Sequence, residues 1–471
     1  MTLGKKTKIV CTIGPATESK EKLLALVEAG MNVARLNFSH GSNEEHGKRV
    51  ETIREIIKKT GKTIAILQDL CGPKIRIGTF KDSTIMLHEG QEFTLTTEEC
   101  EGDEKRVHVN YPNLPKEVKE GTIIMLHDGT KKLQVTKVNG SDIVTKVIIG
   151  GRLSNRKGVN VPGANLSISA LTDKDREDVK FGIANKVDFV ALSFVRRAQD
   201  VNDLRKILVD NGCKAQIISK IETPEALENI DEIIALSDGI MIARGDLAIE
   251  IPTEEVPIVQ KLIIRKCNEV GKPVITATQM LESMIKNQVP TRAEVSDIAN
   301  AIIDGTDAIM LSEETTLGDF PIEAVTVMSK VALRIESEVY TRDTIAEYDE
   351  SHGVTDVVSQ SAVRAAHNIG AKLIVALTRS GRTAKMIARY RPAERILALS
   401  DNPSEISRLM LSFGCYPMVV PTFKTVSEIM DIVRDITSQN KLLKKGDKVV
   451  IAAGMPFGES RETNFILVET I

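Results

Sequence analysis

The apolar and polar segments of the chain repeat one unit: an amphipathic helix, a short turn and a brief apolar strand. Because the apolar residues of these strands are continuous rather than alternating, both faces of each strand should be buried, as in a parallel sheet. Eight such strands are predicted, at residues 8–13, 32–37, 63–67, 187–194, 216–220, 239–243, 273–278 and 308–312. Helices are predicted at 20–29, 43–59, 173–185, 224–235 and 321–336. This alternation indicates an α/β fold built on one closed parallel barrel.

The pattern is interrupted after the third strand. Residues 92–96, 122–126 and 133–138 are strand-like, and turn signals lie at 89–90, 128–129 and 139–140. We expect an all-β domain inserted at the end of the barrel where active sites form, which favours a lid over a passive decoration.

A polar stretch at 337–353 predicts a linker to a last α/β domain, whose strands are expected at 373–377, 396–399, 417–420, 448–453 and 465–468. The predicted division is therefore 1–70 for the first part of the barrel, 71–167 for the lid, 168–340 for the second part of the barrel, and 341–471 for a C-terminal domain.

Charged residues follow the apolar strands directly. Lys220 and Glu222 end the fifth strand, and Arg244 and Asp246 end the sixth. Parallel sheets and barrels bind ligands at these carboxyl ends. Two carboxylates suit Mg²⁺ and a lysine suits a phosphoryl group. A buried ion pair among Lys220, Glu222 and Asp246 explains this segment equally well.

A second candidate site lies in the C-terminal domain. Residues 378–383 read T-R-S-G-R-T between a predicted strand and a helix. Hydroxyls, an N-terminal helix turn and arginines suit an anion. An ordinary helix cap is the alternative.

Composition narrows the function classes. The formal charge is −3, from 62 basic and 65 acidic residues, so neither nucleic acid nor an anionic membrane is an expected partner. Six cysteines without a C-x-x-C pair, no apolar leader and no membrane-length run predict a cytoplasmic protein. The chain lacks the motifs G-x-x-x-x-G-K-[ST], H-E-x-x-H and G-x-S-x-G. A P-loop NTPase, a zinc metalloprotease and an α/β-hydrolase are therefore unsupported.

With these residues in place, the chain resembles the pyruvate kinase family over its whole length. The segments that carry the resemblance are TKIVCTIGPAT, MNVARLNFSHG, GPKIRIGTF, RKGVNVPG, DFVALSFVR, SKIET, MIARGDLAIEIP, TATQMLESM and DGTDAIMLSEET. The resemblance implies a TIM (β/α)8 barrel with a β lid after its third strand and a C-terminal effector domain. It also implies phosphoryl transfer from phosphoenolpyruvate to ADP, the last step of glycolysis, giving pyruvate and ATP.

The resemblance assigns roles to residues at the barrel mouth. Glu222 and Asp246 match the ligands of Mg²⁺, which Mn²⁺ can replace. Lys220 matches the lysine that stabilises the transferred phosphoryl group. Arg35, with Gly245 and Asp246, matches the substrate-binding positions. The remaining implied roles are a proton relay at Thr278, Ser312 and Glu314, with Thr278 also contacting substrate, and nucleotide contacts at Asn37, Arg76 and Lys157.

Many members of the family need K⁺, and this chain departs from their pattern. Asn37, Ser39, Asp69 and Leu70 match the K⁺ positions, but Lys74 stands where those members carry a glutamate. Its ammonium can supply the positive charge, so we expect no K⁺ requirement. If Lys74 is only a solvated hinge residue, K⁺ still binds.

Other expectations concern regulation and assembly. A phosphorylated metabolite is expected to bind Thr378, Ser380, Arg382, Thr383 and Arg461, with residues 454–464 closing over it, and the family is usually a homotetramer. Ala248, Glu313 and His127 depart from the family pattern without removing a required group. Two rival hypotheses are an aldolase or lyase on a related barrel, which needs no lid, and a catalytically silent protein on the same fold.

Overall fold

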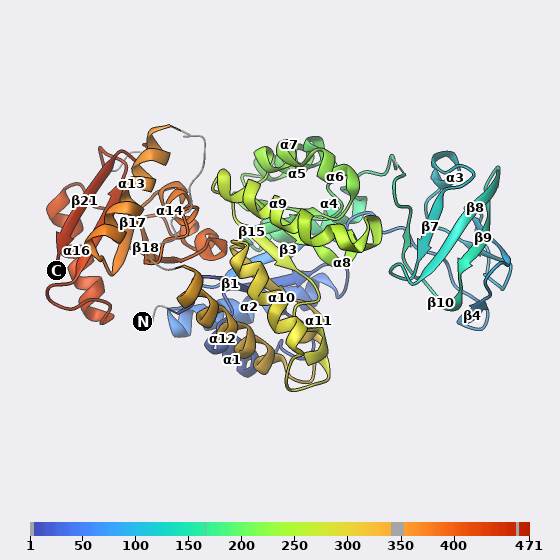
Figure 1. Ribbon diagram of the computed structural model, residues 1–471, viewed down its shortest axis with the longest axis horizontal. Coiled ribbons are helices and arrows are strands. Elements are labelled where there is room, and N and C mark those ends of the chain that lie inside the picture. Colours follow the sequence, from blue (N-terminus) through green and yellow to red (C-terminus); the bar gives the residue numbers. More distant parts are fainter. Residues whose placement is uncertain (1–3, 165, 341–352, 458–460) are drawn as a thin grey trace.

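The computed structural model describes residues 4–164, 166–340, 353–457 and 461–471. Figure 1 shows three bodies in a row along the longest axis: the C-terminal domain, the barrel, and the β lid. Gly4, the first described residue, lies where the first two bodies meet, since its carbonyl accepts from Tyr416 Oη at 2.7 Å. No helix in the described ranges is long and apolar enough to cross a membrane.

The eight predicted strands form the barrel. They are β1 (Lys8–Thr12), β2 (Val33–Asn37), β3 (Ala65–Asp69), β12 (Phe189–Leu192), β13 (Gln216–Ile221), β14 (Gly239–Ala243), β15 (Val274–Ala277) and β16 (Ala308–Leu311). They close in the order β1-β16-β15-β14-β13-β12-β3-β2. The predicted closed parallel barrel is confirmed, with strand ends that differ by up to two residues from the prediction.

The barrel is a packed core because its strands bury both faces. Inward side chains such as Val10, Leu67, Phe189 and Ile218 fill the interior. Outward side chains pack against a ring of helices. The helices of this ring are α1 (Lys20–Ala29), α2 (Asn43–Thr60), α4 (Asp173–Ala184), α5 (Ala198–Asp210), α7 (Ile230–Leu236), α9 (Val256–Glu269), α10 (Arg292–Ile303) and α12 (Pro321–Val339).

Two predictions about the barrel helices are wrong, one on the continuity of a helix and one on where a helix ends. The helix expected at 224–235 is two helices, α6 (Pro224–Glu228) and α7, because Asn229 between them leaves helical geometry at φ −102° and ψ 18°. Its side-chain Nδ2 donates instead to the carbonyls of Arg196 (3.1 Å) and Glu225 (3.0 Å). The linker expected from 337 begins inside α12, which ends at Val339, and most of the rest of that linker lies outside the described residues.

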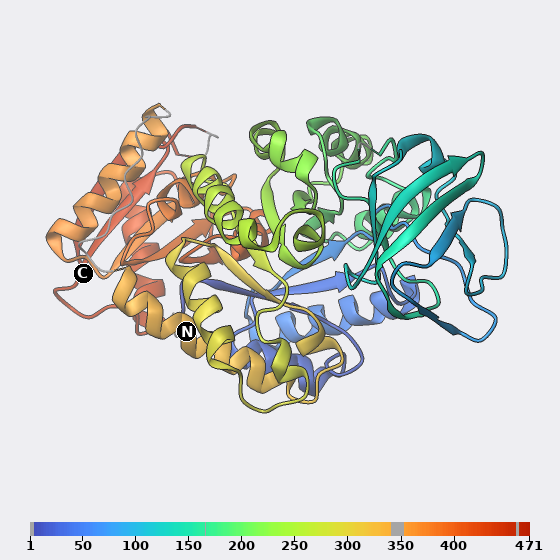
Figure 2. The same ribbon diagram turned by 45° about the vertical axis from the view of Figure 1, so that its right-hand side comes forward.

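The lid is a separate β body with its own core. Its strands are β4 (Thr84–Leu87), β5 (Glu92–Thr96), β6 (Arg106–His108), β7 (Ile123–Leu126), β8 (Lys131–Asn139), β9 (Asp142–Ile149), β10 (Gly151–Ser154) and β11 (Val159–Asn160), with one short helix, α3 (Leu114–Glu117). Six strands pair in the order β11-β7-β8-β9-β5-β6, and β10 pairs with β4. Figure 2 turns the lid forward and shows its sheet next to the barrel. The predicted hairpin turn at Asn139-Gly140 joins β8 to β9.

The C-terminal domain is a five-stranded sheet with helices on it. Its strands are β17 (Leu373–Leu377), β18 (Arg395–Ser400), β19 (Cys415–Val419), β20 (Lys448–Ala453) and β21 (Phe465–Thr470), in the order β19-β18-β17-β20-β21. Only β21 of these described strands runs antiparallel. Its helices include α13 (Val354–Ile369), α14 (Arg382–Ala388) and α16 (Val426–Gln439).

This domain docks on the end of the barrel opposite the lid. Asp307, directly before β16, accepts from Arg391 Nη2 at 2.8 Å and from the Phe413 N–H at 2.9 Å. Both side chains of the Asp307–Arg391 pair are buried. The predicted boundaries at 70/71, 167/168 and 340/341 stay predictions, and residue 341 falls outside the described ranges.

Candidate active site

The carboxyl ends of β2, β3 and β13 bring an arginine, an aspartate and a lysine together. Arg35 Nε donates to Asp69 Oδ2 at 2.6 Å, and Arg35 Nη1 donates to Thr12 Oγ1 at 2.7 Å. Lys220 Nζ lies 3.4 Å from Asp69 Oδ1. Parallel pairing of neighbouring strands places these residues at one level of the barrel mouth.

Lys220 is the centre of this cluster. Its Nζ lies 3.0 Å from Glu222 Oε1 and donates to Ser193 Oγ at 2.7 Å. Ser193 Oγ in turn donates to the Leu70 carbonyl at 2.7 Å. Burial alone favours the neutral amine, but the carboxylates of Asp69, Glu222 and Asp246 outweigh it and raise the pKa of Lys220 above its ordinary value. The lysine is therefore a permanent cation at neutral pH.

The two carboxylates beside Lys220 respond in opposite ways. Burial opposes ionisation of Asp69, but Lys220 and Arg35 together hold its pKa below the ordinary value. Burial, assisted by the charge of Asp246, raises the pKa of Glu222 although Lys220 opposes the shift. Glu222 Oε2 accepts from the Phe194 N–H at 2.6 Å, while its buried Oε1 accepts no well-aligned hydrogen bond from the described residues.

A divalent cation fits this donor set. A bound cation would lower the pKa of Glu222, because positive charge favours the ionised carboxylate. Asp246 lines the adjoining cavity and supplies a second carboxylate. In the described residues no cluster of three or more metal-ligating side chains occurs. A divalent cation held by two carboxylates would leave room in its shell for oxygens of substrate and water.

Thr278 and Gly245 meet at the ends of β15 and β14. Helix α8 (Arg244–Glu250) starts directly from β14, and the Gly245 N–H donates to Thr278 Oγ1 at 2.8 Å. Thr278 has a φ of 69°, a left-handed conformation that is rare for a β-branched residue. Arg244 holds it there by donating to its carbonyl at 2.7 Å and to both oxygens of Asp297. Such strain is typical of functional sites.

Glu314 has a clear structural partnership. Its Oε1 accepts from the Leu281 N–H at 3.1 Å and its Oε2 from the Ser312 N–H at 2.7 Å. Burial raises its pKa. The carboxyl group therefore joins the loops that follow β15 and β16, and Ser312 lies at the end of β16 beside it.

A cavity of about 340 Å³ separates the lid from the barrel mouth. Its walls include Lys74 and Arg76 from one hinge of the lid and Asp246 and Glu250 from the barrel. Asn160 of the lid donates to Glu250 Oε1 at 2.8 Å across the gap. The two hinge segments are paired by an isolated bridge between Arg76 and Gly158. Arg76 and Lys157 are therefore brought to the same hinge.

The residues predicted around K⁺ lie near one another on β2 and β3. Asn37 is the register partner of Asp69, and its Oδ1 accepts from the Ser39 N–H at 3.1 Å. Leu70 is buried in the apolar layer around the barrel. Lys74 is exposed on the wall of the lid cavity.

All five predicted effector residues line one small hollow in the C-terminal domain. Its volume is about 40 Å³, and the lining residues include Thr378, Ser380, Arg382, Thr383 and Arg461. Thr383 and Thr463 share a hydroxyl hydrogen bond of 2.8 Å at its edge. Residues 458–460 of the loop expected to close over the ligand lie outside the described ranges.

Three residues of the cluster were not singled out from the sequence: Thr12, Ser193 and Arg244 as a support of Thr278. Each follows or ends an apolar strand, so the rule that found Lys220 and Asp246 applied to them as well. A lone hydroxyl carries no charge signal, so the sequence gives no reason to single out Thr12 or Ser193.

Comparisons with known proteins agree with this geometry. Family models for the pyruvate kinase barrel domain and the pyruvate kinase alpha/beta domain match residues 4–325 and 356–469. A pyruvate kinase of Geobacillus stearothermophilus is 49% identical over 100% of this chain and 81% of its own. One of Clostridium acetobutylicum is 43% identical over 99% of both.

A solved structure shares the whole architecture. The pyruvate kinase of Cryptosporidium parvum superposes with a TM-score of 0.94 at 38% identity, and the match covers 99% of this chain and 96% of that one. Identity of this extent over both domains excludes a chance likeness of fold. The chain belongs to the pyruvate kinase family.

Proposed function

We propose that the barrel mouth is where this chain carries out its family's reaction, the transfer of a phosphoryl group from phosphoenolpyruvate to ADP to give pyruvate and ATP. The observation that carries the proposal is the buried cluster in which Lys220 lies 3.0 Å from Glu222 and 3.4 Å from Asp69. Beside it lies the cavity walled by Asp246 and the lid. A fixed cation and carboxylates at the edge of a closable cavity are what phosphoryl transfer needs.

Lys220 and Arg35 are the groups that stabilise negative charge. Lys220 is charged and held by Ser193, so it needs no reorganisation when a phosphoryl group arrives. Arg35 presents a fork of N–H donors, of which Nε is already oriented by Asp69. Both would contact the phosphoryl group of the substrate, and Gly245 and Asp246 would receive its carboxylate.

Glu222 and Asp246 would hold the divalent cation, which we assign as Mg²⁺ with Mn²⁺ as a substitute. When bound, the cation supplies positive charge to the substrate oxygens. Lys220, at 3.0 Å, opposes the rise in the pKa of Glu222 that burial causes.

Proton delivery to the enolate carbon is assigned to the group around Thr278. Its hydroxyl has too high a pKa to be a sole acid, so it would relay a proton through water. Thr278 Oγ1 is held in place by the Gly245 N–H at 2.8 Å. Ser312 would belong to the relay, and Glu314 would hold the loop on which Ser312 lies through its bond to the Ser312 N–H.

The nucleotide is assigned to the space beneath the lid. Arg76 and Lys157 at the paired hinge segments would contact its phosphates, together with Asn37 at the end of β2. A cytoplasmic location and a homotetrameric assembly are further parts of this proposal, carried over from the resemblance and from the six scattered cysteines, all of them free thiols.

A coupled assay tests the proposed function. Pyruvate release from phosphoenolpyruvate should require both ADP and a divalent cation. Release without ADP would instead indicate a lyase or hydrolase, and no release under any condition would indicate a silent member of the family.

We also expect a phosphorylated metabolite to raise the affinity for phosphoenolpyruvate through the hollow at residues 378–383. Activation requires that the ligand favour one conformation. The measurement is the substrate concentration for half-maximal rate across a panel of phosphorylated metabolites. A response that Arg461→Gln weakens supports the hollow as its origin, whereas a flat response together with no heat of binding would contradict the assignment.

A further inference from the structure

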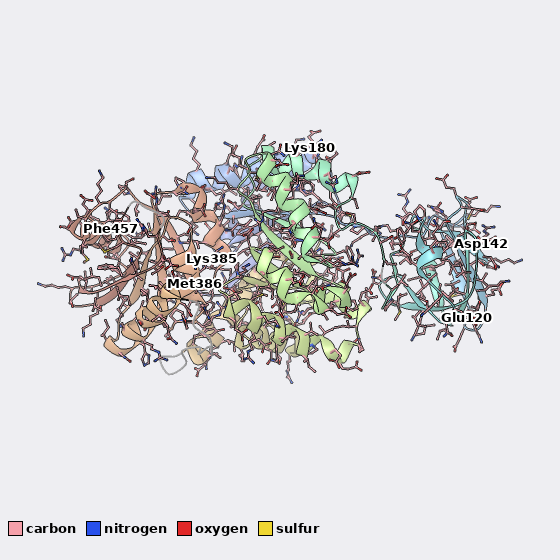
Figure 3. The ribbon with its side chains drawn as sticks, turned by 90° about the horizontal axis from the view of Figure 1, so that it is seen from above. Glu120, Asp142, Lys180, Lys385, Met386 and Phe457 are labelled. Carbon is pink, nitrogen blue, oxygen red and sulfur yellow. The ribbon has the colours of Figure 1, made fainter. Side chains whose placement is uncertain are left out.

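A cavity larger than the effector hollow lies between the barrel and the C-terminal domain, at the end of the barrel opposite the lid. Its volume is about 450 Å³, in the range of small-molecule sites. Figure 3 shows Lys385 and Met386, on its wall, where the two bodies meet. The barrel contributes Gln216 at the start of β13, residues 235–238 before β14 and residues 270–272 before β15, and the C-terminal domain adds Ser380 and Arg382.

The wall of this cavity carries an excess of positive charge. Lys272, Arg382 and Lys385 line it, against the single carboxylate of Asp238. Asp238 is already engaged, since its Oδ2 accepts from Arg205 Nη1 at 2.7 Å and from the Ile217 N–H at 2.8 Å. The lining therefore holds three cations against one carboxylate, which Arg205 shares.

The two lysines are held by neutral acceptors. Lys385 Nζ donates to Gln216 Oε1 at 3.2 Å, and Lys272 Nζ donates to the carbonyls of Ile234 (2.6 Å) and Ala235 (2.7 Å). In the described part of the chain neither ammonium forms an ion pair. Burial lowers the pKa of both groups although the charge of Asp238 opposes the shift, and Lys385 lowers the pKa of Lys272 further. An ammonium has three donors, so each retains hydrogen-bonding capacity for an anion.

We propose that this cavity binds the phosphate group of a phosphorylated small molecule, with Lys272 from the barrel and Lys385 and Arg382 from the C-terminal domain as its ligands. The site differs from the effector hollow, which lies on the other side of the loop after β17. Ser380 and Arg382 line both spaces, so that loop is the wall between them. A bound phosphate would join the two bodies at the start of β13, the strand that carries Lys220 at its other end.

Protection of the two lysines tests the proposal on the whole protein. The protein is treated with an amine-acylating reagent in inorganic phosphate, or in sodium chloride of equal ionic strength, and acylation at each lysine is measured by mass spectrometry. At about ten times the dissociation constant the site is about nine-tenths occupied, so acylation of Lys272 and Lys385 should fall about tenfold. The exposed Lys372 of the same domain should react equally in both salts. A second arm with glycerol 2-phosphate tells whether a monoester binds more tightly than the free ion.

Variants separate this cavity from its neighbour. Lys385→Gln should abolish the protection of Lys272, because the phosphate loses a ligand, whereas Arg461→Gln in the effector hollow should leave it intact. Equal acylation in phosphate and chloride would overturn the proposal. Protection that disappears with Arg461→Gln would overturn it as well, because the anion would then lie in the effector hollow. The protection measured on the unaltered protein remains decisive if a variant fails to fold.

Discussion

Lys220→Met is expected to lower the rate of ATP formation by about a thousandfold or more while the protein keeps its fold. A preorganised cation on a transferring phosphoryl group is worth about 10³- to 10⁵-fold in rate, which is about 4 to 7 kcal/mol at about 1.4 kcal/mol for each factor of ten. Methionine is close to lysine in length and removes only the charge and its donors. The fold should survive because Asp69 keeps its bond to Arg35 at 2.6 Å and Glu222 keeps the Phe194 N–H at 2.6 Å.

The same variant should separate the two halves of the reaction. Lys220 is assigned no proton transfer, and Thr278 keeps its support from Gly245 and Arg244. Exchange of the methyl protons of pyruvate with solvent should therefore fall much less than ATP formation. The measurements are initial rates of ATP formation and proton exchange followed by NMR, on protein with an unchanged circular dichroism spectrum.

Lys180→Met on the exposed surface of α4 is the matched control, because it makes the same replacement outside the site. It should alter neither rate. An equal loss of ATP formation and proton exchange in Lys220→Met would remove the proposed division between Lys220 and Thr278.

The second large effect concerns K⁺. Turnover should change little when K⁺ is replaced by a bulky inert cation at constant ionic strength, and Lys74→Glu should create a strong K⁺ requirement. Lys74 lines the lid cavity together with Arg76 and Asp246, so its ammonium adds positive charge where the phosphates are proposed to lie. Asp69, the charged member of the predicted K⁺ group, already pairs with Arg35 and Lys220. Both contacts reduce the need for a further cation.

Charge reversal elsewhere in the lid controls for general electrostatics. Lys81 is exposed in the same domain, and Lys81→Glu makes the same change of two charge units away from the cavity. It should leave the response to K⁺ unchanged. An unaltered enzyme that loses nearly all activity without K⁺ would contradict the role of Lys74.

The lid and the C-terminal domain illustrate what short-range pattern can predict. The turn signals at Asp128-Gly129 and Asn139-Gly140 predict two β-hairpins that the structure contains, because Asp, Asn and Gly tolerate the positive φ that tight hairpin turns require. Strand β9 is not among the predicted strands, although Ile143, Thr145 and Val147 alternate inward. Its neighbours are predicted from the turn signals that flank them, and not from such alternation. Asn229 divides a predicted helix because its side chain binds Arg196, a residue 33 positions away.

The sequence by itself determined the closed parallel barrel and the mouth at which Lys220, Glu222, Asp246 and Thr278 lie. Continuous apolar strands must be buried on both faces, and parallel strands place their carboxyl ends at one mouth. Only the tertiary structure decided which of those residues touch. Asp69 bonds Arg35 and approaches Lys220, and Ser193 accepts from Lys220 across 27 positions of chain. Such contacts depend on the register between strands and on side-chain direction, which arise from packing of the whole barrel and leave no local pattern to read.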